Sequence, residues 1–154
     1  MADSSEVLIG SSDVAGAPHV LIRPLRRSLP GLFDAGEGNW IECDLEIAAG
    51  AFHAAFPVHL RSEEFHAFLE EAQHLHRTLD GTASFNALEG QFALSLSGDG
   101  KGGLHVSGEA IDDAGSGNRL QFKFDVDQNG LPAICASLEH LLAAFPVIDR
   151  SDVT

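Results

Sequence analysis

The chain of 154 residues has no tyrosine, one tryptophan and only two cysteines. Because tyrosine is favoured at the centre of protein interfaces, its absence argues against a binding surface rich in aromatic anchors. Cys43 and Cys135 are far apart, and two cysteines are too few for a disulfide-stapled scaffold. Both fall at positions expected in a core, so we predict two buried free thiols in a reducing cytoplasm.

Long apolar segments are also missing. No run approaches the roughly 20 apolar residues needed to span a bilayer, and residues 1–6 lack the basic and apolar regions of a signal peptide. We therefore predict a soluble, cytoplasmic protein. A chain of 154 residues buries enough surface for one independent core. We expect a single domain over residues 1–154, with loose tails at residues 1–6 and 147–154.

Positive charge is scarce. Nine lysines and arginines stand against 23 aspartates and glutamates, which gives a formal net charge of −14. Such a surface repels nucleic acids and anionic membranes, because both attract proteins largely through lysine and arginine. We therefore expect neither as a partner. A basic protein surface would be attracted, although an acidic surface also serves simply to keep a cytosolic protein soluble.

The clearest pattern that is present is a series of alternating segments. Within residues 40–48, apolar side chains alternate with Glu42, Asp44 and Glu46, which predicts a strand with one buried and one solvent-facing side. The following alternating segment contains Pro57, which lacks a backbone donor and so indicates an edge or a bulge. In sequence order, the segments that fit strands are residues 7–9, 19–23, 40–48, 52–60, 82–88, 92–97, 103–110 and 119–126, the first two least clearly.

Two segments change to helical periodicity. Apolar residues of segment 62–79 recur every three or four positions, with Ser62 as the expected N-cap and His76 on the apolar side. A second helix is expected over residues 132–145, with Pro132 in its first turn. The order of these segments predicts an α+β fold. We expect a curved antiparallel sheet of about six to seven strands with both amphipathic helices packed on one face.

Two loops resemble ligand-binding motifs. Residues 125–130 match the opening D-x-D-x-N-G of a calcium loop, but its twelfth position falls on Ala136 instead of a glutamate. A strand-to-helix turn capped by Asp127 or Asn129 fits better, and whether calcium binds is left open. The glycines of residues 98–103 join two expected strands, which favours a hairpin connection over a phosphate-binding loop.

The sequence offers no recognisable catalytic or metal-binding constellation. Its eight histidines form neither H-x-x-x-H nor H-E-x-x-H, and neither cysteine lies in a catalytic context. Acidic pairs are adjacent in the sequence, so their side chains diverge instead of converging. We predict a non-catalytic protein without a metal ion or cofactor.

One row of charges is a candidate binding site. Glu42, Asp44 and Glu46 occupy alternate positions of a strand and therefore project from one face. Like charges in a row destabilise a sheet slightly unless something compensates them. Two interpretations are equally open. Cross-strand bases such as Arg119 or Lys123 compensate the row, or the three carboxylates form an acidic strip that binds a basic partner.

Several short motifs occur in an order that resembles a known family. After Trp40, which opens the first clear strand, come G-A-F at 50–52, S-E-E-F at 62–65, L-D-G-T-A at 79–83, F-x-F-x-x-D-Q at 122–128, L-P at 131–132 and L-L-A-A-F-P at 141–146. In this order they resemble the WapI-like family of small bacterial proteins, which includes immunity proteins of contact-dependent toxin systems. The likeness covers about two thirds of the chain and lies mostly at fold-forming positions.

The resemblance implies a binding protein that neutralises a cognate toxin, typically a nuclease, by occlusion. A nuclease has a basic substrate groove, which an acidic inhibitor complements electrostatically. We therefore expect a basic protein toxin as partner and the acidic strip of Glu42, Asp44 and Glu46 as the contact. The alternative is a small-ligand or metal-binding accessory domain that uses residues 125–130 or a histidine cluster. The sequence leaves the toxin and the oligomeric state open.

Overall fold

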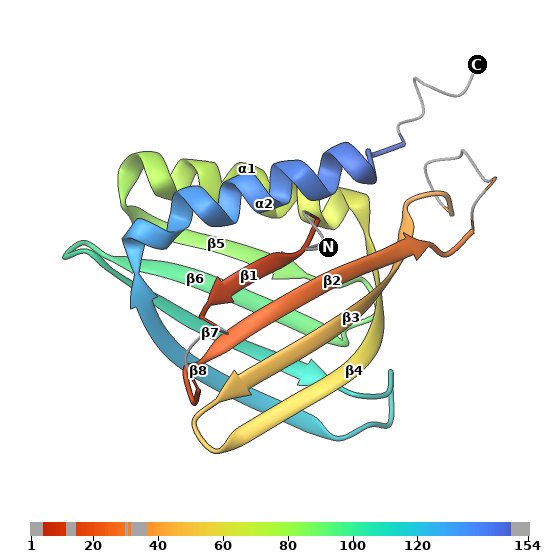
Figure 1. Ribbon diagram of the computed structural model, residues 1–154, viewed down its shortest axis with the longest axis horizontal. Helices are drawn as coiled ribbons and strands as arrows, with labels where there is room; N and C mark the ends of the chain where they lie inside the picture. The colour runs from red at the N-terminus through yellow and green to blue at the C-terminus, as the bar shows by residue number, and fades with distance from the viewer. Residues whose placement is uncertain (1–4, 12–14, 30, 32–36, 149–154) are drawn as a thin grey trace.

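The computed structural model describes residues 5–11, 15–29, 31 and 37–148. Four strands followed by a helix occur twice along the chain (Figure 1). The first set comprises β1 (Val7–Gly10), β2 (His19–Arg27), β3 (Trp40–Ala49), β4 (Phe52–Arg61) and α1 (Ser62–Thr78). The second set comprises β5 (Asp80–Asn86), β6 (Phe92–Asp99), β7 (Gly103–Ile111), β8 (Arg119–Asp127), the 3-10 turn η1 (Gln128–Gly130) and α2 (Leu131–Ala144).

The strands form two antiparallel four-stranded sheets. Sheet A has the order β1-β2-β3-β4, and sheet B has the order β5-β6-β7-β8. The predicted α+β class, with antiparallel strands and two helices, is confirmed. There are eight strands because both short N-terminal segments pair, β1 with β2 and β2 with β3. They divide into two sheets because α1 separates the fourth strand from the fifth.

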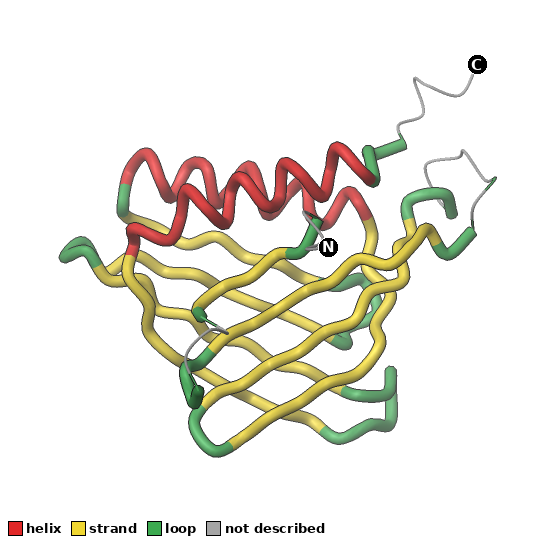
Figure 2. Tube along the Cα trace, in the orientation of Figure 1, coloured by secondary structure: helices red, strands yellow, loops and turns green. Residues whose placement is uncertain are grey.

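The two helices lie side by side along one side of the molecule, as the tube in Figure 2 also shows. Helix α1 contacts β5, and α2 contacts β1, so the helices lie beside the first strand of each sheet. The backbone N–H of Ser84 on β5 donates to Glu71 of α1 at 2.9 Å. This carboxylate occupies an edge donor that would otherwise be open to another chain. The last strands, β4 and β8, form the other edges, which agrees with Pro57 lying on an edge strand.

Alternation along the strands fills the core. The inward side chains of β3 are Ile41, Cys43, Leu45 and Ile47, and all four are almost completely buried. Sheet B and α1 contribute aromatic rings, with the centroid of Phe85 5.1 Å from that of Phe65 and 5.6 Å from that of Phe92. Buried side chains of both sheets and both helices form one continuous cluster. Both cysteines are buried and free, as predicted.

Helix α1 differs from the expectation at both of its ends. Its N-cap is Arg61, because Glu64 accepts hydrogen bonds from the Arg61 backbone N–H at 2.9 Å and from Nε at 3.0 Å. The Ser62 hydroxyl is buried and has no hydrogen-bond partner among the described residues, so the prediction of a serine cap is wrong. His76 is exposed rather than buried, because the buried stripe of the helix ends at Leu75.

Parts of the predicted loose tails make defined contacts. Glu6 pairs with Arg23 at 2.7 Å. At the other end of the chain, the buried Asn39 side chain donates to the Ile148 carbonyl at 3.1 Å and accepts the Ile148 N–H at 2.7 Å. The outermost tail residues lie outside the described residues, and a single domain stays a prediction. No helix in the described part of the chain is long and apolar enough to cross a membrane.

Candidate partner-binding face

The outer face of sheet A carries the acidic strip. Glu42, Asp44 and Glu46 lie at alternate positions of β3 and point away from the core, while the residues between them are buried. Strand β3 lies between β2 and β4, so side chains from two neighbouring strands flank the strip. The predicted shared face is therefore confirmed. The role of the strip in binding a partner stays a prediction.

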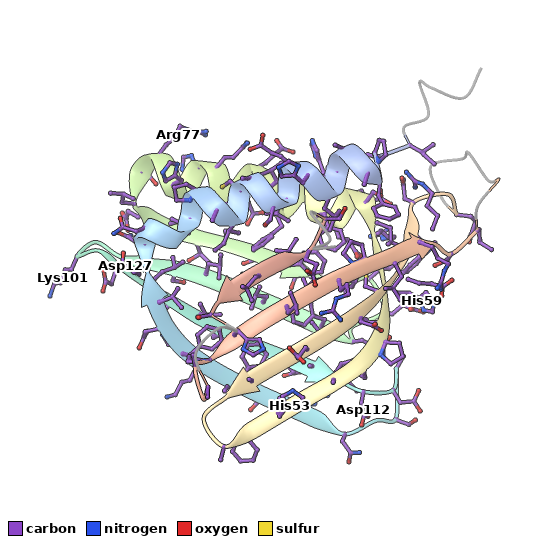
Figure 3. All side chains as sticks on the ribbon, viewed as in Figure 1. His53, His59, Arg77, Lys101, Asp112 and Asp127 are labelled. Carbon is purple, nitrogen blue, oxygen red and sulfur yellow. The ribbon has the colours of Figure 1, made fainter. Side chains whose placement is uncertain are left out.

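Basic side chains pair with the two ends of the strip. Nη1 of Arg26 on β2 lies 2.8 Å from Oε1 of Glu42. At the other end, Glu46 lies between two imidazoles, with Nε2 of His19 at 3.0 Å and Nε2 of His53 at 3.6 Å. Figure 3 labels His53 on β4. The hydrogen bond with His19 lowers the pKa of the Glu46 carboxyl below its usual value, and His53 adds to the effect.

The middle of the strip is the most accessible carboxylate. Asp44 is exposed and lies opposite Arg23 of β2 in the strand register. The Arg23 Nε donates to Glu6 Oε2 at 2.7 Å. This hydrogen bond raises the pKa of Arg23, and the charges of Asp44 and Glu46 add to the effect. Arg23 is thus shared among several carboxylates, and Asp44 is the member of the strip most open to solvent.

The bases that compensate the strip are not those expected from the sequence. Arg119 and Lys123 lie on β8 of sheet B, so the expectation that they are cross-strand neighbours of the strip is wrong. Arg119 instead pairs with Glu109 on the adjacent β7 at 2.9 Å. The error arises because β2 and β4, and not β8, are hydrogen-bonded to β3. Compensation itself exists, since Arg26 and the two histidines provide it.

The calcium-like loop is a capped turn. Oδ1 of Asp127 accepts the N–H of Asn129 at 2.8 Å and caps η1, as predicted. Asp125, the first carboxylate of the motif, is exposed and lies 2.8 Å from Nδ1 of His105 on β7. Over residues 5–11, 15–29, 31 and 37–148, no group of three or more His, Cys, Asp or Glu side chains is arranged to hold a metal ion.

The glycine-rich loop between β6 and β7 is a hairpin connection, as predicted. Oδ1 of Asp99 accepts the N–H groups of Lys101 at 2.7 Å and Gly103 at 3.0 Å. These hydrogen bonds to the backbone lower the pKa of Asp99. The loop therefore uses its own N–H groups to hold its own carboxylate, which is the arrangement of a structural turn.

Comparison with known proteins assigns the chain to a family. Residues 11–146 match the immunity protein WapI-like family. The chain belongs to this family. No curated protein matches it. Among solved structures, it is similar to a chain of the CdiA-CT/CdiI toxin and immunity complex from Enterobacter cloacae, at 11% identity and a TM-score of 0.42, with 77% of this chain and 97% of that chain covered.

This WapI-like chain has a second outer face that the sequence analysis did not identify. The outward side chains of β5, β6 and β7 are mostly short and include Thr82, Ser84, Ala93, Ser95, Ser97 and Ser107. A shallow depression of about 550 Å³ lies over sheet B, lined in part by Ala93, Ser95, Ser107 and Lys123. The signal was present in the sequence, because small residues at every second position of two neighbouring strands predict a thinly covered face.

Proposed function

We propose that this chain is an immunity protein that neutralises a cognate nuclease-type toxin by binding it through an acidic surface. Membership of the immunity protein WapI-like family carries the proposal. The formal net charge of −14 supports it, because a nuclease binds its polyanionic substrate in a basic groove. The protein acts in the cytoplasm by occlusion, and no step of this function requires catalysis.

The acidic strip suits such a partner because its carboxylates are regularly spaced and their existing ion pairs are weak. Alternate residues of a strand lie about 7 Å apart, so Glu42, Asp44 and Glu46 present a fixed row of carboxylates. Arginine and lysine side chains that would bind phosphates bind carboxylates through similar charge-assisted hydrogen bonds. In each existing pair of the strip at least one side chain is open to solvent, so a pair is worth about 1 kcal/mol or less. Basic residues of a toxin can therefore replace Arg26 and the histidines at little cost.

Charge reversal tests this proposal. Because a cell that makes a toxin needs its antidote at the same time, we expect the toxin gene to lie beside the gene of this chain, and the probe is the purified toxin domain from that gene. The test variant combines Glu42→Lys, Asp44→Lys and Glu46→Lys. The control combines Glu109→Lys, Asp125→Lys and Glu139→Lys, which changes the net charge equally but lies outside the strip. We expect the strip variant to bind the toxin at least about tenfold more weakly than the control and to lose most of the salt dependence of Kd.

The outcomes test the immunity function and the choice of the acidic strip separately. If the wild-type chain neither binds the toxin domain nor restores growth of cells that produce it, the immunity function is wrong. If the wild-type chain binds and the two triple variants bind equally well, the immunity function stands and the choice of the strip is wrong.

A small-ligand accessory role is the second candidate function. The depression over sheet B favours it, because its volume of about 550 Å³ is within the range of small-molecule sites. Thermal unfolding with calcium, zinc and common metabolites tests it. A ligand at a hundred times its Kd stabilises the folded state by about 2.7 kcal/mol, so an unchanged Tm across the panel removes this candidate.

A further inference from the structure

Leu88 is an exposed apolar side chain on a well-anchored loop. It is 62% exposed and lies between β5 and β6. The N–H of Ala87 donates to Phe92 O at 3.0 Å, and the N–H of Gly90 donates to Ala87 O at 3.0 Å. The N–H of Leu88 itself donates to Oε2 of Glu64 at 2.7 Å. The backbone that presents Leu88 is therefore fixed before any partner arrives.

Glu64 joins this loop to the start of α1. Its side chain is only 5% exposed, and it accepts the N–H of Leu88 together with the backbone N–H and the Nε of Arg61. A buried carboxylate is stable only when its charge is paired and its oxygens are hydrogen-bonded. These bonds meet that requirement, so Glu64 holds Leu88 and Arg61 in a fixed relation.

Arg61 in turn lies against the single tryptophan of the chain. Its guanidinium carbon is 5.8 Å from the centroid of the half-buried Trp40 ring, a cation–π contact. The exposed Leu29 lies close to this tryptophan, because the N–H of the preceding residue, Ser28, donates to Trp40 O at 2.9 Å. Tryptophan and arginine are the residue types that most often dominate binding energy at interfaces. We name Trp40, Arg61 and Leu88 together the end surface.

Carboxylates lie on the segments next to the end surface. Glu63 pairs with Arg61 at 3.2 Å, and Glu89 follows Leu88 in the chain. Asp112 and Asp113 begin the β7–β8 loop. The Ile111 N–H donates to Gln91 O at 2.8 Å, and Gln91 Nε2 donates to Ile111 O at 3.3 Å, which brings the β7–β8 loop beside the loop of Leu88. Figure 3 places Asp112 at the same end of the molecule as His59, with Lys101 at the opposite end. The apolar centre thus has an acidic rim.

We propose that the end surface is the docking site for the basic toxin, with Leu88 entering an apolar recess of the toxin and the surrounding carboxylates contacting its basic residues. This inference rests on the proposed function and deepens it. Charge complementarity favours a basic protein as the occupant. A loop that is already ordered loses little conformational entropy on binding. The end surface also continues into the acidic strip, because Glu42 is two residues beyond Trp40 on β3.

The test compares Leu88, whose loop is tied through Glu64 to Arg61 at the end of β4, with an exposed apolar side chain at the start of β4. Leu88→Ser removes the anchor, and Leu88→Met keeps an apolar side chain there. The matched control is Phe52→Ser, since Phe52 is 67% exposed and lies at the start of β4, about 30 Å along the strand from Arg61. Both serine variants should retain the wild-type Tm, because neither side chain is buried.

The probe is the same purified toxin domain, titrated by calorimetry. We expect Leu88→Ser to weaken Kd ten- to a hundredfold, as the loss of one buried leucine requires, with Leu88→Met and Phe52→Ser close to wild type. If Leu88→Ser binds the toxin with wild-type affinity, the end surface is not the docking site, while the immunity function stands. Equal losses for Leu88→Ser and Phe52→Ser also overturn it. If the wild-type chain does not bind, the proposed function fails and this inference fails with it.

Discussion

Sheets A and B have the same topology but differ on both of their faces. The inner face of sheet A is formed by aliphatic side chains such as Ile9, Ile22 and Ile47, whereas sheet B contributes Phe85 and Phe92. On the outside, sheet A carries long charged side chains that pair across strands. Sheet B carries mostly short polar side chains on β5 and β6 beside an open depression, and its charged pairs join β7 to β8. A repeated order of four strands and a helix therefore does not indicate which sheet binds a partner.

The largest expected effect concerns the inner faces. Phe85→Ala removes a ring that contacts Phe65, Phe68 and Phe92, so we expect a loss of about 3–5 kcal/mol in the free energy of unfolding. Val20→Ala in sheet A removes only two methyl groups and should cost about 2 kcal/mol. Guanidinium denaturation of both variants measures the difference. Equal losses would mean that the aromatic cluster is no more important to the core than the aliphatic face.

A smaller effect is expected from filling a position that the aromatic face keeps empty. A Cβ on Gly108 of β7 would lie 2.5 Å from Phe122 Cζ and 2.6 Å from Ala93 O. Since the second neighbour is backbone, Gly108→Ala should destabilise the fold by about 1–3 kcal/mol. The control is Gly130→Ala, where the backbone is helical and no atom lies within 4 Å of the added Cβ. That variant should be neutral or slightly stabilising, and a similar loss for both would contradict the steric argument.

The sequence predicted well on which face of a strand a side chain lies, and poorly which strands lie next to each other. Period-two alternation reports only the face on which a side chain lies, so the shared face of Glu42, Asp44 and Glu46 followed directly. Which strands flank β3 depends on pairing between distant segments, and a local alternating pattern contains no information about that pairing. Lys123 and Arg119 were therefore expected as cross-strand neighbours of the strip, although they lie on β8 of the other sheet.

The ends of α1 illustrate a second limit. Serine is a common N-cap, but here the carboxylate of Glu64 reaches back to Arg61 and makes the serine hydroxyl unnecessary. The same carboxylate binds the N–H of Leu88, a residue of a loop 24 positions later. A buried residue that serves two segments at once cannot be recognised from either segment alone. The sequence analysis therefore missed the end surface, because the positions of Trp40 and Arg61 in the chain do not reveal their contact with each other or their link to Leu88.

A third prediction sharpens the comparison of the outer faces. Because the hydrogen bond with His19 lowers the pKa of Glu46, this pair stabilises the fold above the ordinary glutamate pKa of 4.5. The contribution is lost as the pH falls below that value and Glu46 becomes protonated. Since the Glu46 side chain is 40% exposed and solvent screens the pair in part, His19→Gln should reduce stability at pH 6 by at most about 1 kcal/mol and by less at pH 3. Urea denaturation at both pH values measures this.

The matching variant on sheet B is His105→Gln, which removes a partner of Asp125. Here Asp125 is more exposed than Glu46 and pairs with one histidine instead of two, so the loss at pH 6 should be smaller. An equal or larger effect on sheet B would mean that the paired charges of sheet A are not more tightly held.

The smallest effect compares the two thiols and leaves stability unchanged. Burial raises the pKa of Cys43 to about 12, with the charges of Asp44 and Glu64 adding to the effect. Burial also raises the pKa of Cys135, helped by Glu139, but this thiol lies on α2 next to solvent-exposed helix residues. Only the thiolate reacts with iodoacetamide, so at pH 8 Cys135 should be alkylated first and Cys43 only after sheet A opens. Peptide mass spectrometry over time measures the order, with guanidinium-unfolded protein as the control in which both thiols react alike. Simultaneous alkylation of the folded protein would mean that sheet A and α2 open together as one cooperative unit.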